Sequence, residues 1–97
     1  METKIALTVL IRAKPERAEE LKVAILALIE QTIKEPGCEV FKVFQHHDHA
    51  ELFTLWEVFS NQLAMQEHMQ KDYTKKYFAL DLVESVLGTQ HIELTVT

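Results

Sequence analysis

Two ionisable side chains, His68 and Glu57, lie in apolar stretches of the sequence and could carry out proton transfer. On a helix, His68 lies on the same face as Met65 and Met69. Met65 is three residues before His68 and four residues before Met69, and these spacings place side chains on one side of a helix. A histidine gains and loses a proton near neutral pH, so in an apolar cavity it could act as a general base. The alternative is a histidine at the edge of the core whose ring bonds a backbone group or a carboxylate.

Glu57 follows Trp56 in a strongly apolar segment. Burying a carboxylate costs free energy unless the group is paired or protonated. One interpretation gives Glu57 a part in the chemistry, orienting a substrate or stabilising charge. The other is a structural carboxylate, bonded to backbone N–H groups or to a residue of a partner subunit.

Aromatic residues occur near both groups and could bind a flat substrate. Met65, on the face of His68, would contribute to the same pocket. Aromatics at these spacings are also typical of a plain core or a dimer interface. The aromatic residues in question are Trp56, Phe59, Tyr73 and Tyr77.

Nothing in the sequence indicates a bound metal or organic cofactor. The cluster His46-His47-Asp48-His49 has metal-ligating types, but its setting is that of a solvated turn, and metal ligands need convergent geometry. The chain has only two glycines, and no phosphate-binding loop or flavin or nicotinamide fingerprint. Cys38 is alone, so no intrachain disulfide is expected. Any redox chemistry would therefore have to be driven by the substrate itself.

The elements that must position these residues follow from the hydrophobic periodicity. Leu21, Ile25, Leu28 and Thr32 recur at helical spacing, whereas alternation is typical of strands. We predict a first strand at Lys4–Arg12 and then a helix that begins at Pro15 and ends at Pro36-Gly37. Two strands follow, at Cys38–Gln45 and Leu52–Phe59, joined by the turn His46–Glu51. The rest of the chain is predicted to form a helix at Gln62–Gln70 capped by Ser60 or Asn61, a helix from its cap Asp72 to about Val83, a stop of the helical pattern at Gly88, and a last strand at Thr89–Thr97.

This order fits an α+β ferredoxin-like sandwich, in which helices cover one face of a four-stranded antiparallel sheet. We expect residues 1–97 to form a single domain. Apolar residues occur in both rows of the strand Leu52–Phe59, yet these helices can cover only one sheet face. The sequence therefore predicts a homodimer in which a second copy covers the other face.

Charge and hydropathy exclude two classes of partner. A net charge of −5 and one basic doublet, Lys75-Lys76, do not suit a nucleic-acid surface. The longest apolar tract, Val23–Ile29, is too short to cross a bilayer. We expect a cytoplasmic protein that acts on a small molecule.

Several short motifs occur together in a characteristic order: Glu35-Pro36-Gly37-Cys38 with Phe41, then Glu57-Val58-Phe59, then Ala64-Met65 with His68. In these motifs the chain resembles the antibiotic biosynthesis monooxygenase family, small dimeric α/β-barrel proteins. The resemblance implies a cofactor-independent monooxygenase acting on a small aromatic or quinol-like substrate, with His68 as base. Members also include isomerases and proteins without assigned activity, so an isomerase of a small metabolite and a non-catalytic dimeric binding module remain alternatives.

Two departures from the family pattern narrow this expectation. The Asn–Trp–His set of haem-degrading members falls on Thr8, Phe59 and the region Tyr77–Phe78, so haem degradation is not expected. Members often carry a second histidine in a Pro-His-Phe sequence, where this chain has Asp72-Tyr73-Thr74. The resemblance thus implies Tyr73 as a weaker substitute in proton transfer.

Overall fold

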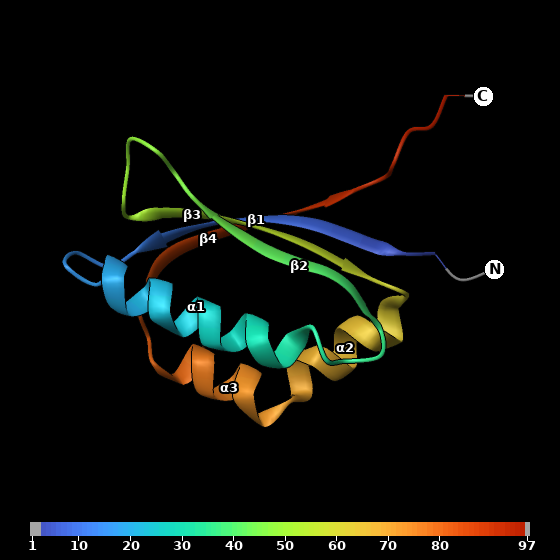
Figure 1. The fold of residues 1–97 in the computed structure, drawn as a ribbon, viewed down its shortest axis with the longest axis horizontal. Helices are drawn as coiled ribbons and strands as arrows, with labels where there is room; N and C mark the ends of the chain where they lie inside the picture. The colour runs from blue at the N-terminus through green and yellow to red at the C-terminus, as the bar shows by residue number, and fades with distance from the viewer. Residues whose placement is uncertain (1–2, 97) are drawn as a thin grey trace.

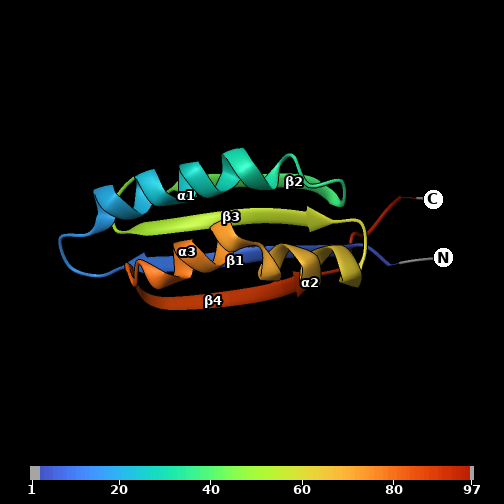
Figure 2. The same cartoon turned by 90° about the horizontal axis from the view of Figure 1, so that it is seen from below.

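The computed structural model describes residues 3–96 as one antiparallel sheet with helices on one face. Figures 1 and 2 show α1, α2 and α3 on the same side of the strands. The predicted ferredoxin-like α+β sandwich is therefore confirmed. The elements are β1 Ile5–Ala13, α1 Ala18–Thr32, β2 Cys38–Gln45, β3 Leu52–Phe59, α2 Gln62–Gln70, α3 Asp72–Ala79 and β4 Val83–His91.

The strand order is β2-β3-β1-β4, so that β1 lies in the interior of the sheet and pairs with both β3 and β4. The hairpin β2–β3 has the predicted bounds, and its register places Phe41 opposite Glu57. Every second residue of β3 is buried beneath the helices: Phe53, Leu55, Glu57 and Phe59. The two predicted rows of this strand are confirmed.

Helix α1 buries Leu21, Ile25, Leu28 and Thr32, which are the residues that the periodicity predicts. Its start was predicted too early, at Pro15. The helix begins instead at Ala18, because Glu16 has a φ of 65°, which no right-handed helix can include. Glu19 and Glu20 lie in the first turn, where the helix dipole favours negative charge.

The bounds predicted for the last two elements are wrong. Helix α3 ends at Ala79 and Asp81 has a φ of 54°, so the chain turns there and does not continue as a helix to Val83. Strand β4 runs from Val83 to His91, Gly88 lies within it opposite Val9, and residues 92–96 are not a strand. Pairing with β1 overrides the local helical pattern here. Thr97 lies outside the described residues.

The start of α2 is fixed by two close contacts. Of the two predicted caps, Ser60 and Asn61, it is Asn61 whose side chain accepts a hydrogen bond from the Ala64 backbone N–H. A Cβ on Gly37 would lie 2.3 Å from the Ala64 Cβ, so only glycine allows this approach. Asp72 does not cap α3: the cap residue is Lys71, and Asp72 lies in the first turn.

No helix in the described part of the chain is long and apolar enough to cross a membrane.

Candidate functional site

The helices and the sheet enclose a cavity of about 340 Å³, in the size range of small-molecule sites. Side chains from every helix and every strand line it, and most are apolar. Its polar lining consists of Glu57, His68, Thr74, Tyr77 and Asp81. A mostly apolar cavity with a few polar groups suits a small, largely apolar ligand.

His68 is held rigidly at this cavity. Its Nδ1 lies 2.9 Å from Oε2 of Glu35, and both residues are buried. The ring also contacts Phe59 and Phe41, at centroid distances of 5.1 and 5.6 Å. Because a carboxylate accepts hydrogen bonds, Nδ1 donates to Glu35 and Nε2 remains as the acceptor available to the cavity.

Glu35 accepts a second hydrogen bond, from the hydroxyl group of Tyr73 at the start of α3. Desolvation, followed by this bond and the charge of Glu35, raises the pKa of Tyr73 above the ordinary tyrosine value. Tyr73 is not among the residues that line the cavity. The structure therefore makes it a donor that fixes the carboxylate behind His68.

Glu57 reaches the cavity from β3 and is 5% exposed. Its carboxyl group has no side-chain hydrogen bond within residues 3–96. Burial raises its pKa to about 7, so the neutral form of the group persists to higher pH than in an exposed glutamate. A carboxylic acid in this state can donate or accept a proton.

Two hydroxyl groups of α3 complete the polar lining. The hydroxyl oxygens of Thr74 and Tyr77 are buried and lack a hydrogen-bond partner among the described residues. Burial, and then the nearby charge of Glu57, raises the pKa of Tyr77 to about 12. Both hydroxyl groups therefore stay protonated at neutral pH.

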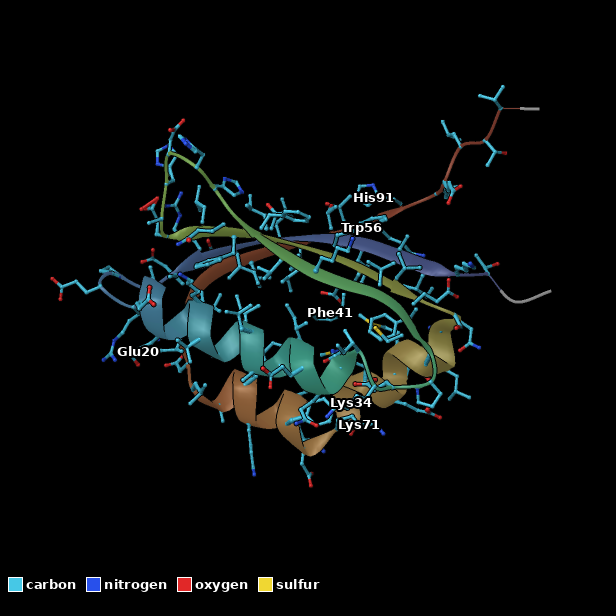
Figure 3. All side chains as sticks on the ribbon, in the orientation of Figure 1. Glu20, Lys34, Phe41, Trp56, Lys71 and His91 are labelled. Carbon is cyan, nitrogen blue, oxygen red and sulfur yellow. The ribbon has the colours of Figure 1, made fainter. Side chains whose placement is uncertain are left out.

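The remaining residues predicted for the site are divided between the two sheet faces. Met65 and Tyr77 line the cavity, and Phe59 lies buried behind the His68 ring. Trp56 lies on the opposite face of the sheet, with its ring 6.3 Å from that of His91 (Figure 3). The four predicted aromatics are therefore not brought together in one pocket of this chain.

The histidines of the β2–β3 turn point to different partners. His46 bonds to Thr54, His47 to Asp48, and His49 lies 3.4 Å from Glu51. Within residues 3–96 there is no group of three or more His, Cys, Asp or Glu side chains placed to hold a metal ion. At Cys38, burial and then the charge of Glu35 raise the thiol pKa to about 11, which makes it a poor nucleophile.

Sequence reasoning missed Glu35 and Thr74 as parts of the site. Glu35 lies between α1 and β2. In the sequence it was interpreted only as part of the motif Glu35-Pro36-Gly37-Cys38, at which a helix ends. The one available signal was that this motif and His68 both belong to the same set of family marks. Thr74 carries no such signal beyond its position three residues before Tyr77 on α3.

The fold and the site thus define an α+β protein with a ferredoxin-like sheet and an apolar cavity lined by acid–base groups. The family model described as antibiotic biosynthesis monooxygenase matches residues 4–80, and the chain belongs to this family.

Two solved structures are similar to this chain in fold, and a third protein is similar to it in sequence. The crystal structure of PA3566 from Pseudomonas aeruginosa is 25% identical, with a TM-score of 0.91 over 98% of both chains. That of SO0527 from Shewanella oneidensis is 28% identical, with a TM-score of 0.85 over 94% of this chain and 91% of the other. The uncharacterized protein sll1783 of Synechocystis sp. is 28% identical over 67 residues, which make up 69% of this chain. The matched segment covers 46%, or about half, of that relative's length.

Proposed function

We propose that this protein is a cofactor-independent monooxygenase that acts on a small aromatic or quinol-like substrate. The observation that carries the proposal is the buried pair of His68 and Glu35, whose geometry leaves Nε2 as an acceptor at an apolar cavity. Membership of the antibiotic biosynthesis monooxygenase family supports the same class of reaction.

In the proposed reaction, Nε2 of His68 removes the proton of a substrate hydroxyl group. Glu35 is a positioning residue that fixes the tautomer and orientation of the ring, and Tyr73 holds Glu35 in place. The resulting anion is rich in electrons, and its ring carbon bonds to oxygen to give a substrate peroxide. Loss of the hydrogen on that carbon and cleavage of the O–O bond leave a carbonyl group, so the substrate supplies all four electrons that oxygen needs. One oxygen atom stays on the substrate carbon, and the other leaves as water with the two protons lost from the substrate hydroxyl group and carbon.

Glu57 is the second proposed catalytic group. In its neutral form the carboxyl group can donate a hydrogen bond to the oxygen on which negative charge develops. Met65 and Tyr77 contribute to the substrate-binding surface. Phe59 supports the base from behind, and Trp56 belongs to the other sheet face.

The proposal is tested by oxygen consumption with a panel of quinols, measured against their spontaneous oxidation. We expect His68→Ala to lower the enzymatic rate on the order of a hundredfold or more, as for loss of a general base. Glu35→Gln keeps the size of the side chain but removes the carboxylate, so it should lower the rate less and alter the pH profile.

Melting curves of each variant give the necessary control for folding. A His68→Ala variant that remains folded and keeps the wild-type rate would refute His68 as the base. No oxygen consumption above the spontaneous rate by the wild-type protein would refute the monooxygenase proposal.

Isomerisation of a small metabolite is the second candidate function. It is favoured by one observation, that His68 and Glu57 face the same cavity and Glu57 has a pKa of about 7. One group could remove a proton and the other return it to a different carbon. Turnover that proceeds without oxygen and still requires both residues would support this alternative.

We also propose that the protein is a homodimer, joined through the sheet face that lacks helices. That face carries apolar side chains from all of its strands, and several are exposed in the single chain: Leu10, Phe44 and Leu87, beside the half-buried Trp56. A partner sheet would cover them, as in the dimeric α/β barrel that the sequence predicts.

A further inference from the structure

Thr74 and Tyr77 line the cavity, and their buried, unpartnered hydroxyl groups have no part in the proposed proton transfer. Thr74 is 1% exposed, and neither its hydroxyl oxygen nor that of Tyr77 has a partner within residues 3–96. A buried hydroxyl group without a hydrogen bond costs free energy, and native proteins rarely leave one unsatisfied. Both residues line the cavity, so a ligand bound there could supply the missing partner.

The two hydroxyl groups come from one rigid element and one side. Thr74 and Tyr77 are three residues apart on α3, which places them on the same helix face. Each can donate one hydrogen bond and accept others. Together they offer two donors to a single ligand oxygen.

The charges at the cavity restrict what this oxygen can be. The lining contains Glu57 and Asp81 but no lysine or arginine, and His68 is already bonded to Glu35. Because the exposed carboxylate of Asp81 is ion-paired with Lys14, at 2.7 Å, Glu57 is the acid that faces a ligand without a cation beside it. Glu57 and Tyr77 line the same cavity. A ligand carboxylate would meet like charge without a cation, whereas an uncharged oxygen would meet two donors.

We propose that Thr74 and Tyr77 form an oxygen-binding subsite, at which their hydroxyl groups hold an uncharged hydroxyl or carbonyl group of the ligand while Glu57 disfavours carboxylates. The inference rests on the proposed function only in placing the substrate in this cavity. It concerns binding and requires no turnover.

Three probes that share one carbon skeleton test the subsite by calorimetric titration at pH 8: naphthalene, 2-naphthol and 2-naphthoate. We expect 2-naphthol to bind at least about fivefold more tightly than naphthalene, which corresponds to one net hydrogen bond. We expect 2-naphthoate to bind most weakly of the three.

Two variants remove the hydroxyl groups with little change of shape, Thr74→Val and Tyr77→Phe. Each should weaken 2-naphthol binding by roughly fivefold while leaving naphthalene binding unchanged. Thr54→Val is the matched control, because Thr54 lies on the opposite sheet face, bonded to His46. Without ligand, Thr74→Val should melt at or above the wild-type temperature, since it removes an unsatisfied donor.

Equal binding of 2-naphthol by the wild type and both variants would overturn the subsite. So would a wild-type preference for 2-naphthoate, or no measurable binding of 2-naphthol. Failure of the oxygen assay is a separate result: a protein that consumes no oxygen but shows the expected probe order keeps the subsite and loses only the monooxygenase reaction.

Discussion

At the scale of single residues, the two acid–base groups of the cavity have opposite surroundings. His68 is fixed by a buried carboxylate, whereas the carboxyl group of Glu57 makes no side-chain hydrogen bond within residues 3–96. The first arrangement favours a defined tautomer, and the second favours the uncharged carboxyl group. Such a division lets one group accept a proton while the other donates a hydrogen bond.

The isolation of Glu57 predicts a pH-dependent stability. Its pKa is raised from 4.5 to about 7 by burial, so the ionised form is destabilising in the folded state. The penalty is absent below about pH 4.5, where the carboxyl group is neutral in both folded and unfolded chains, and it is complete above pH 7. Glu57→Gln should therefore raise the free energy of unfolding at pH 8 by on the order of 2–3 kcal/mol.

Urea unfolding of the wild type and Glu57→Gln at several values between pH 4.5 and 8 measures this difference. Glu51→Gln is a control at a more exposed carboxylate of the β2–β3 turn. A stability difference that does not grow with pH, or that grows equally for both variants, would contradict the raised pKa of Glu57.

Spacing alone predicted that His68 lies on the inward face of its helix, with Met65. It could not decide which sheet face carries Glu57, because both rows of the strand Leu52–Phe59 contain apolar residues, and it could not predict the partner of His68. Glu35 is far from it in sequence, and their contact depends on how the corner before β2 packs against α2. For the same reason, the missing partners of Thr74 and Tyr77 could be recognised only once the packing around α3 was known.

At the scale of elements, the position of α2 decides whether His68 reaches Glu35. The helix approaches the corner between α1 and β2 at Gly37, where the Ala64 Cβ leaves no room for a side chain. The backbone N–H of Ser60 also donates to the carbonyl oxygen of Gly37, at 2.8 Å. This corner carries Glu35, so the close contact sets the distance between the two members of the pair.

Gly37→Ala should disturb both folding and the site. A Cβ 2.3 Å from another carbon must displace α2, and such overpacking costs typically about 1–3 kcal/mol. Gly88→Ala is the matched control, because a Cβ there meets nothing within 4 Å. We expect denaturant unfolding to show a clear loss for the first variant and little change for the second.

A second substitution identifies the clash as the cause. Ala64→Gly removes the opposing Cβ, so in a double-mutant cycle it should recover part of the stability lost in Gly37→Ala. Strictly additive effects of the two substitutions would show that the contact does not determine the packing of α2.

The sequence predicted the bounds of an element well where its hydrophobic pattern fits only a helix or only a strand. It predicted them poorly where helical spacing and strand alternation occur in the same segment. The β2–β3 hairpin combines apolar alternation with a polar turn, and its bounds are as predicted. After Tyr77, the residues Leu80, Val83 and Leu87 recur at helical spacing, although Val83 and Leu87 belong to β4. Only the pairing of Leu87 with Leu10 on β1 decides in favour of a strand.

At the scale of the whole molecule, the sheet has one face covered by helices and one without them (Figures 1 and 2). Leu10 and Leu87 are neighbours on the uncovered face, and Leu87 is 63% exposed in the single chain. We therefore expect sedimentation to show a dimer at micromolar concentration.

Leu87→Asp should place a charge in this interface and raise the dimer dissociation constant by about tenfold or more. Leu63→Asp is matched in exposure, at 61%, but lies on α2 at the helical side, so it should leave the dimer intact. A folded wild-type monomer at micromolar concentration, or equal effects of the two variants, would refute the proposed interface.

The sheet order also bears on how the chain is made. Strand β1 is synthesised before every other described element, yet one of its two neighbours is β4, which follows all of them. At roughly 5–20 residues per second, β1 emerges from the ribosome several seconds before β4 can pair with it. During that interval one edge of β1 is open, and the cavity lacks the wall that Val83 and Val86 supply. The nascent chain thus passes through a stage in which its apolar cavity is uncovered, and a translational pause before β4 would prolong its exposure to aggregation and to chaperones.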